Sequence, residues 1–493
     1  MKSRLAFWLL AAAGFALPLR GAELNGWPLR VATVDDQTGE VTAQQGLGPL
    51  LAERTTADGK EIRAWRPLFL NTKQADREAS YFLYPLFSWQ HDAASESFSF
   101  FQLINFRRQP GLASDGGHPV RGFDVWPLYF SRDTGDPATS YRALLPIAGE
   151  VKHRFGKDRL SWVAAPLYFR VEKDGRHTNY VPWPFLRFTG GNGHHGFEAW
   201  PLFGHVARPN DYDNRYFLWP LIYQQTKQLD DPAGATRTNL GFLPFYTRAT
   251  APGFVDENYL WPFFGYTDRT APHRYHETRY FWPFLVQGRG DNRTVNRWAP
   301  FYTHSVVKGY DKTWVLWPLV RHAEWNEQGV AHERNQFLLV VYWSHEQRSL
   351  SNPAAAPASK RHLWPLFSAW DNGAGRRQFQ LFSPFEVLFT NNEPIRELYS
   401  PIFAVYRFEQ RAPGDTRWNI LWNLVSRRRS ATEREFHLGP LFSTRATPET
   451  GARVALGNGL LSWRRAPGEA RWKFSLFDFR RTPATKAPAA TQP

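Results

Sequence analysis

The chain has 493 residues, a formal net charge of +15, no cysteine and a single methionine, which is its first residue. Without cysteine it can have neither a disulfide framework nor thiolate chemistry. Phe, Tyr and Trp make up 16% of the residues, so there is apolar material for a large core, and disorder of the whole chain is excluded.

The N-terminus has the layout of a secretory signal peptide. Lys2 and Arg4 precede an apolar run at residues 5–19, and small residues follow that run. A basic segment, an apolar segment and a small-residue cleavage site in this order are typical of exported proteins. A retained anchor is the alternative, although the run is short for a membrane span. We predict export, with cleavage after Ala22 and a single β-domain over residues 23–481.

A five-residue motif recurs from one end of the chain to the other, with a Trp-Pro pair between apolar residues. The pairs include Trp126-Pro127, Trp200-Pro201, Trp219-Pro220, Trp261-Pro262, Trp282-Pro283, Trp317-Pro318 and Trp364-Pro365. Looser copies, such as Leu243-Pro244 and Ala299-Pro300, keep only the proline. Together they mark about 24 units with a mean spacing of about 19 residues, just below the range typical of solenoid repeats. We assign the Trp-Pro pairs as the structural residues of a tandem repeat.

Each repeat is predicted to form one extended strand that contains the motif. Proline at this frequency is incompatible with helices and biases the preceding residue toward extended geometry. Aromatic and β-branched residues flank the prolines, as at Trp314-Val315, and turn-forming residues such as Asp174-Gly175 separate the repeats. Connections this short join antiparallel neighbours. The predicted fold is therefore an all-β, repeat-built antiparallel up-and-down meander of about 24 strands.

The spacing of the repeats favours closure of the meander as a large barrel. The three longest intervals end at Pro127, Pro244 and Pro365, and all three are odd-numbered connections. Long loops on one side and short turns on the other are typical of outer-membrane barrels. The last strand, residues 472–479, alternates apolar and polar side chains and ends on an aromatic residue. In this it resembles the C-terminal strand of outer-membrane barrel proteins.

A soluble sheet, coiled or packed in two layers, is the alternative. Around Trp219 the motif is apolar on both faces of the expected strand, which is typical of a sheet covered on both sides. A proline in a central strand also removes a hydrogen-bond donor, at a greater cost in lipid than in water. The tryptophans expected to be buried are Trp219, Trp261, Trp282, Trp317 and Trp364.

The sequence contains no catalytic or metal-binding motif of a known kind. It has no GxSxG, no phosphate-binding loop and no HExxH. His194-His195 could be a metal pair, but adjacent residues of a strand point to opposite faces, and the glycines nearby predict a turn. The pairs Asp35-Asp36 and Asp230-Asp231 are also assigned to turns. We predict a non-enzymatic protein with no catalytic, cofactor-binding or metal site.

The basic residues gather late in the chain. They include Arg427-Arg428-Arg429, Arg464-Arg465 and Arg480-Arg481, and loss of the leader lowers the net charge to +12. A polyanion, such as anionic lipid headgroups or an acidic glycan, is the partner that this charge suggests, and solvated strand ends are the alternative. Export argues against nucleic acid. Residues 482–493 form an Ala/Pro/Thr-rich tail that we expect to be disordered.

These observations predict an exported envelope protein, an outer-membrane β-barrel that acts as a pore or transport channel. The alternative is a soluble periplasmic or surface β-repeat protein that binds or scaffolds envelope glycans.

Overall fold

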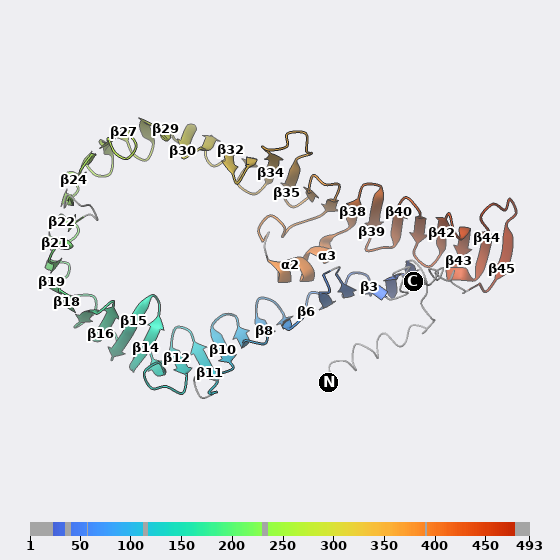
Figure 1. The fold of residues 1–493 in the computed structure, drawn as a ribbon, viewed down its shortest axis with the longest axis horizontal. Coiled ribbons are helices and arrows are strands. Elements are labelled where there is room, and N and C mark those ends of the chain that lie inside the picture. The colour runs from blue at the N-terminus through green and yellow to red at the C-terminus, as the bar shows by residue number, and fades with distance from the viewer. Residues whose placement is uncertain are drawn as a thin grey trace, which may run out of the picture. The chain divides into compact units, whose positions relative to one another are not determined.

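The structure is a computed structural model that describes residues 23–34, 41–56, 58–111, 117–228, 235–389 and 392–478 (Figure 1). The predicted signal peptide, the two Asp-Asp pairs and the C-terminal tail lie outside these residues. Contacts divide the chain into two compact units. Unit 1 comprises Met1–Ala93, Gly329–His332 and Val340–Pro493, and unit 2 comprises Ala94–Gln328 and Glu333–Leu339.

The prediction of an all-β antiparallel meander is confirmed. The described residues form 45 strands, and each assigned pairing joins consecutive strands in antiparallel orientation. None of the helices among the described residues is long and apolar enough to cross a membrane.

The first strands of unit 1 are β1 (Leu24–Gly26), β2 (Arg30–Val34), β3 (Val41–Gly46), β4 (Leu51–Thr55), β5 (Glu61–Trp65), β6 (Phe69–Gln74), β7 (Arg77–Phe82) and β8 (Phe87–His91). The later part of unit 1 contains β34 (Tyr342–Ser349), β35 (Ala358–Leu363), β36 (Phe367–Asp371), β37 (Arg377–Leu381), α2 (Glu393–Leu398), α3 (Ser400–Phe403) and β38 (Tyr406–Ala412). It ends with β39 (Asp415–Ile420), β40 (Val425–Arg429), β41 (Arg434–Leu438), β42 (Phe442–Thr447), β43 (Gly451–Leu456), η2 (Gly457–Gly459), β44 (Leu461–Arg465) and β45 (Lys473–Leu476).

Unit 2 begins with β9 (Glu96–Phe100), β10 (Ile104–Gln109), β11 (Val120–Val125), β12 (Tyr129–Asp133), β13 (Tyr141–Leu144), β14 (Ala148–Arg154), β15 (Lys157–Val163) and β16 (Tyr168–Lys173). It continues with β17 (Arg176–Tyr180), β18 (Leu186–Gly191), β19 (His194–Ala199), β20 (Phe203–Arg208), β21 (Tyr212–Phe217), β22 (Ile222–Gln228), β23 (Thr236–Phe242) and β24 (Tyr246–Ala251). The remaining strands are β25 (Phe254–Tyr259), β26 (Phe264–Arg269), β27 (Tyr275–Phe281), β28 (Leu285–Gly290), β29 (Arg293–Trp298), β30 (Tyr302–Val307), β31 (Tyr310–Val315), β32 (Val320–Glu327) and, divided between the units, β33 (Val330–Phe337).

The Trp-Pro motif forms turns, so the expectation that it lies within a strand is wrong. Strand β21 ends at Phe217 and β22 begins at Ile222, and Trp219-Pro220 lies in the connection between them, with a cis peptide bond. The Leu221 N–H donates to the Leu218 carbonyl oxygen at 2.7 Å, which closes a four-residue turn. Each repeat therefore contains two strands and two turns. This is why the structure has 45 strands rather than about 24.

Two kinds of turn alternate along the chain. Between β18 and β19, for example, the two-residue loop Asn192-Gly193 has positive φ at both positions, +49° and +77°, as an Asn-Gly hairpin turn requires. Successive turns of an antiparallel meander lie at opposite ends of its strands. All turns that contain the motif or its looser copies therefore lie along one edge of the sheet, here called the Trp-Pro edge. The polar turns lie along the other edge.

This arrangement removes the spacing argument for a barrel. An interval between two prolines spans a complete hairpin, so odd and even intervals do not correspond to opposite sides of the sheet. Within the described residues of unit 1, β1 pairs with β2 and β45 pairs with β44, and no pairing joins β1 to β45. The expected closure into a barrel is not seen.

In unit 1 the N-terminal strands instead contact the C-terminal part of the unit through side chains. Leu398 of α2 is completely buried and packs with Ala52, Ile62, Ala64 and Leu70 of β4–β6. The Asn392 side chain caps this helix by accepting a hydrogen bond from the Ile395 N–H at 3.0 Å. Polar contacts that include the ion pairs Arg54–Glu397 and Glu23–Arg417 accompany this packing, and we call the whole contact the polar seam.

Candidate functional site

The tryptophans of the Trp-Pro edge are exposed. Trp219, Trp261, Trp282, Trp317 and Trp364 have between 37% and 60% of their surface accessible, so the expectation that they are buried is wrong. Trp126 is also exposed, and Trp200 is half-buried. A turn at the edge of a sheet has neighbours on fewer sides than a central strand. The motif therefore presents its rings outward instead of filling a core.

Backbone hydrogen bonds join neighbouring Trp-Pro turns. Leu243 N–H donates to the Leu221 carbonyl oxygen at 2.7 Å, and Trp282 N–H donates to the Phe263 carbonyl oxygen at 2.7 Å. Aromatic rings of neighbouring turns also stack, as Phe263 does on Phe281 with a centroid distance of 5.3 Å. The sheet's hydrogen-bond ladder thus extends into its turns, so these turns form an ordered apolar surface.

The strand residues next to these turns form a second apolar feature, here called the apolar row. Residues directly opposite each other in paired strands project from the same face of the sheet. In unit 2 such partners run Leu186, Ala199, Phe203, Phe217, Ile222, Phe242, Tyr246, Tyr259 and Phe264. In unit 1 they run Tyr342, Leu363, Phe367, Leu381, Tyr406, Ile420, Val425, Leu438, Phe442, Leu456, Leu461 and Leu476. Many of these side chains are exposed, including Phe203, Phe217 and Phe242.

The opposite face of the sheet, here called the polar face, carries paired polar groups beside the same edge. In unit 2, Arg279 donates to Asp256 at 3.1 Å and to the Thr267 hydroxyl at 2.8 Å. Arg187 and Glu198 form an ion pair at 2.8 Å. The two faces of the sheet therefore differ near the Trp-Pro edge, since one is apolar and exposed while the other is polar and internally hydrogen-bonded.

In the C-terminal strands of unit 1 the apolar surface extends further from the Trp-Pro edge. A second row, two residues further from the edge, includes Phe379, Phe408, Trp418, Phe436, Val454, Trp463 and Phe474. Arg427 and Thr444 lie in the same row. The next row on this face contains the opposed arginines Arg429 and Arg434, followed by Ala446 and Ala452.

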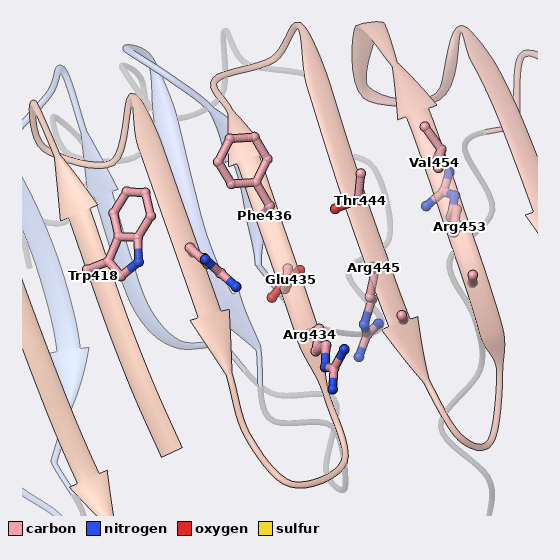
Figure 2. Close-up of a pocket in the computed structure, with 11 residues that line it drawn as sticks. Trp418, Arg434, Glu435, Phe436, Thr444, Arg445, Arg453 and Val454 are labelled. Atoms are coloured by element: carbon pink, nitrogen blue, oxygen red, sulfur yellow. The ribbon is translucent and has the colours of Figure 1, made fainter. Parts of the chain in front are cut away.

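A hollow of about 350 Å³ opens among these residues, and Figure 2 shows the side chains around it. Trp418, Phe436, Arg427 and Arg434 surround it, and the small residues Thr444, Ala446 and Ala452 form its floor; Glu435, Arg445, Arg453 and Val454 complete the lining. The hollow exists because three small side chains follow large ones across neighbouring strands. We call it the β40–β43 hollow.

The polar seam of unit 1 encloses a second cavity of about 390 Å³. Several of its charged groups are paired with one another: Arg54 with Glu397 at 2.6 Å, and Arg407 with Glu409 at 2.6 Å. Arg66 donates to the carbonyl oxygens of Glu397 and Pro49, and burial lowers its pKa to about 10. This cavity is held together by its own ion pairs.

The histidine pair singled out in the sequence begins strand β19 and does not form the turn that we expected, because the turn ends at Gly193. His194 Nδ1 lies 2.8 Å from the Tyr212 hydroxyl oxygen, and the His195 ring lies 6.4 Å from that of His205. The two histidines thus have different partners. Across the described residues, no group of three or more His, Asp or Glu side chains is placed to hold a metal ion.

The apolar row and the β40–β43 hollow were not identified from the sequence. The signal for the apolar row was present in the apolar residues that flank each Trp-Pro pair, such as Phe217 and Ile222. Strand register was needed to show that these residues share one face. No protein-family model matches the chain, and no curated protein sequence matches it.

Proposed function

We propose that this chain is an exported, non-enzymatic envelope protein that attaches to a lipid membrane through its Trp-Pro edge. The observation that carries the proposal is the combination of exposed tryptophans with the continuous apolar row beside them. Contiguous exposed apolar surface of more than a few hundred Å² marks an interaction site in most proteins. Tryptophan is also enriched where proteins meet the membrane–water interface.

The lengths of the strands favour insertion into one leaflet over a membrane-spanning channel. A membrane-spanning strand needs about 9–11 residues, and no strand in the described part of the chain exceeds 8 residues. Beyond the apolar row the same face soon becomes polar, as at Arg215 and Gln224. The apolar part of this face therefore extends only a short way from the Trp-Pro edge. This suits the roughly 5–10 Å by which interfacial elements enter a membrane.

The chemistry of the edge suits reversible attachment. Burial of one large apolar side chain contributes about 1.5–3 kcal/mol, so a few tryptophans and phenylalanines are enough to hold the protein at an interface. The basic charge of the chain adds attraction to anionic lipid. The signal-peptide layout of the N-terminus supports export to the periplasm, with the outer membrane as the expected location.

Vesicle flotation of the mature chain tests this proposal. We expect the protein to float with phosphatidylcholine vesicles, and the variant Trp219→Ser/Trp261→Ser/Trp282→Ser to remain largely in the soluble fraction. Trp370 is as exposed as Trp219, at 37%, but lies in β36 away from the edge. Trp370→Ser should therefore float normally, whereas Trp219→Ser should bind more weakly.

Two results would reject the proposal. One is a wild-type protein that stays soluble with every vesicle but is retained on an envelope glycan, which would favour the aromatic edge as a sugar-binding surface. The other is a triple variant that is correctly folded and floats as the wild type does.

A further inference from the structure

We infer that the β40–β43 hollow binds the phosphate of an anionic lipid headgroup. This inference rests on the membrane attachment proposed above and adds a lipid class and a position to it. Three observations support it. Two arginines at the hollow are unpaired, its floor consists of small residues, and its arginines lie at a suitable distance from the apolar row.

Two of the four arginines that line the hollow have no acidic partner, whereas Arg445 and Arg453 are paired with Glu433 and Asp478. The side chains of Arg427 and Arg434 are exposed and form no hydrogen bond or ion pair with any other residue that the structure describes. On the polar face of the same strands, Arg428 and Arg445 both contact Glu433, at 3.7 and 2.7 Å. Side chains alternate between the two faces along a strand. The arginines with an acidic partner therefore lie on one face, and those without one lie on the other.

The register also places two like charges directly opposite each other. Arg429 is the cross-strand partner of Arg434, and both side chains are exposed. Like charges in this position are destabilising unless something compensates for them. An anion between them would do so, since guanidinium groups bind phosphate oxygens through paired, charge-assisted hydrogen bonds.

The hollow has room for such a group. Thr444, Ala446 and Ala452 keep the floor low, and the volume of about 350 Å³ lies in the range of small-molecule sites. The Thr444 hydroxyl adds a hydrogen-bond donor on this floor. Larger side chains at these three positions would close the hollow.

The distance from the apolar row identifies the ligand as an amphiphile. Leu438, Phe436 and Arg434 follow one another on the same face of β41, at increasing distance from the Trp-Pro edge. At about 3.3 Å per residue, Arg434 lies about 13 Å from Leu438. Acyl chains alongside the apolar row would therefore bring a headgroup phosphate to the level of the arginines, which can extend toward it.

The test compares vesicles of phosphatidylcholine alone with vesicles that also contain phosphatidylglycerol. We expect wild-type protein to bind the anionic vesicles more tightly, and Arg427→Gln/Arg434→Gln to lose about 10- to 30-fold of this affinity. Its binding to phosphatidylcholine alone should fall much less, because the choline cation offsets the charge of that headgroup's phosphate and the Trp-Pro edge still attaches the protein. The latter measurement reports on membrane attachment itself, so failure of the general proposal and failure of this inference are distinguishable.

Three controls make the assignment specific. Arg121→Gln/Arg289→Gln removes two exposed arginines of unit 2, on strands that do not line the hollow, and it should retain most of the preference for phosphatidylglycerol. Vesicles given the same charge with oleate should bind less tightly than phosphatidylglycerol vesicles, because a carboxylate replaces the phosphate. Excess glycerol phosphate should not release the protein.

Equal losses in the two double variants would show a diffuse charge effect and overturn the site. So would equal binding to oleate and phosphatidylglycerol vesicles. Release by glycerol phosphate would overturn the lipid assignment. Circular dichroism and thermal unfolding of each variant establish that the fold is retained.

Discussion

The guanidinium of Arg417 lies 2.8 Å from the carboxylate of Glu23, which joins two residues 394 positions apart in the chain. Glu23 also accepts a hydrogen bond from the Ser426 hydroxyl at 2.7 Å. Burial by itself raises the pKa of Glu23, but Arg417 and its neighbours outweigh burial and hold the pKa below its ordinary value. A buried ion pair thus links the N-terminal part of unit 1 to its C-terminal strands.

Removal of one partner from this pair should weaken the polar seam. Because Glu23 has little solvent access, Arg417→Met leaves a buried carboxylate uncompensated, and we expect a loss of about 3–5 kcal/mol in the unfolding free energy. Urea unfolding measures it. Glu23→Gln/Arg417→Met should recover part of the loss, whereas Arg377→Ala, at the more exposed pair with Asp371, should change stability little. Equal effects of Arg417→Met and Arg377→Ala would contradict a structural role for the seam.

The histidine beside this pair should make unit 1 less stable at alkaline pH. Burial lowers the pKa of His437, but the hydrogen bond to Glu435 at 3.0 Å and the charge of Glu23 raise it above the ordinary value of 6.5. The stabilisation from the protonated ring is complete below pH 6.5 and is lost as pH rises through the higher folded-state value. We expect the melting temperature of the wild type to fall over this range. That part of the fall should be absent in His437→Gln, and identical pH profiles would refute the assignment.

Two tryptophans with opposite environments should respond differently to truncation. Trp162 is 2% exposed and packs with Phe130, Tyr141, Ala143 and Val151, so Trp162→Ala should cost about 3–5 kcal/mol. Trp282 at the Trp-Pro edge is 41% exposed, and Trp282→Ala should cost much less while weakening vesicle binding. Chemical unfolding and flotation of both variants measure the difference. Equal losses of unfolding free energy in the two variants would show that Trp282 is a core residue.

Close packing explains why a glycine stands within strand β23. A Cβ atom at Gly241 would lie 2.0 Å from the Tyr223 ring, whereas one at Gly122 would meet nothing closer than 3.7 Å. Gly241→Ala should therefore destabilise the sheet by about 1–3 kcal/mol, and Gly122→Ala should have little effect. Unfolding curves of the two variants test the expectation. A fully stable Gly241→Ala protein would show that the ring moves aside at no cost.

The depth of insertion can be measured with brominated lipids. If the Trp-Pro edge enters only one leaflet, bromines close to the headgroup should quench tryptophan fluorescence more strongly than bromines near the bilayer centre. Most of the quenching should disappear in Trp219→Ser/Trp261→Ser/Trp282→Ser. Maximal quenching by the deepest bromines would instead support a membrane-spanning arrangement.

The 19-residue repeat spacing is itself long enough for two strands in each repeat. Strands are commonly 5–6 residues long, so about 19 residues accommodate two strands and two turns better than one strand and one long loop. The flanks of Trp219 illustrate the ambiguity. Phe217 and Ile222 are the ends of two different strands, yet in the sequence they look like one continuous apolar segment.

The sequence by itself determined the all-β class, the tandem repeat and the antiparallel meander. These follow from local chemistry, since proline excludes helices and Asn-Gly or Asp-Gly pairs form tight turns. The tertiary structure decided where the motif lies, which side chains share a face, and that Glu23 meets Arg417. Proline is compatible with both strand ends and turns, and only hydrogen bonds between successive repeats distinguish the two. The seam depends on contacts between residues hundreds of positions apart, for which no local pattern exists.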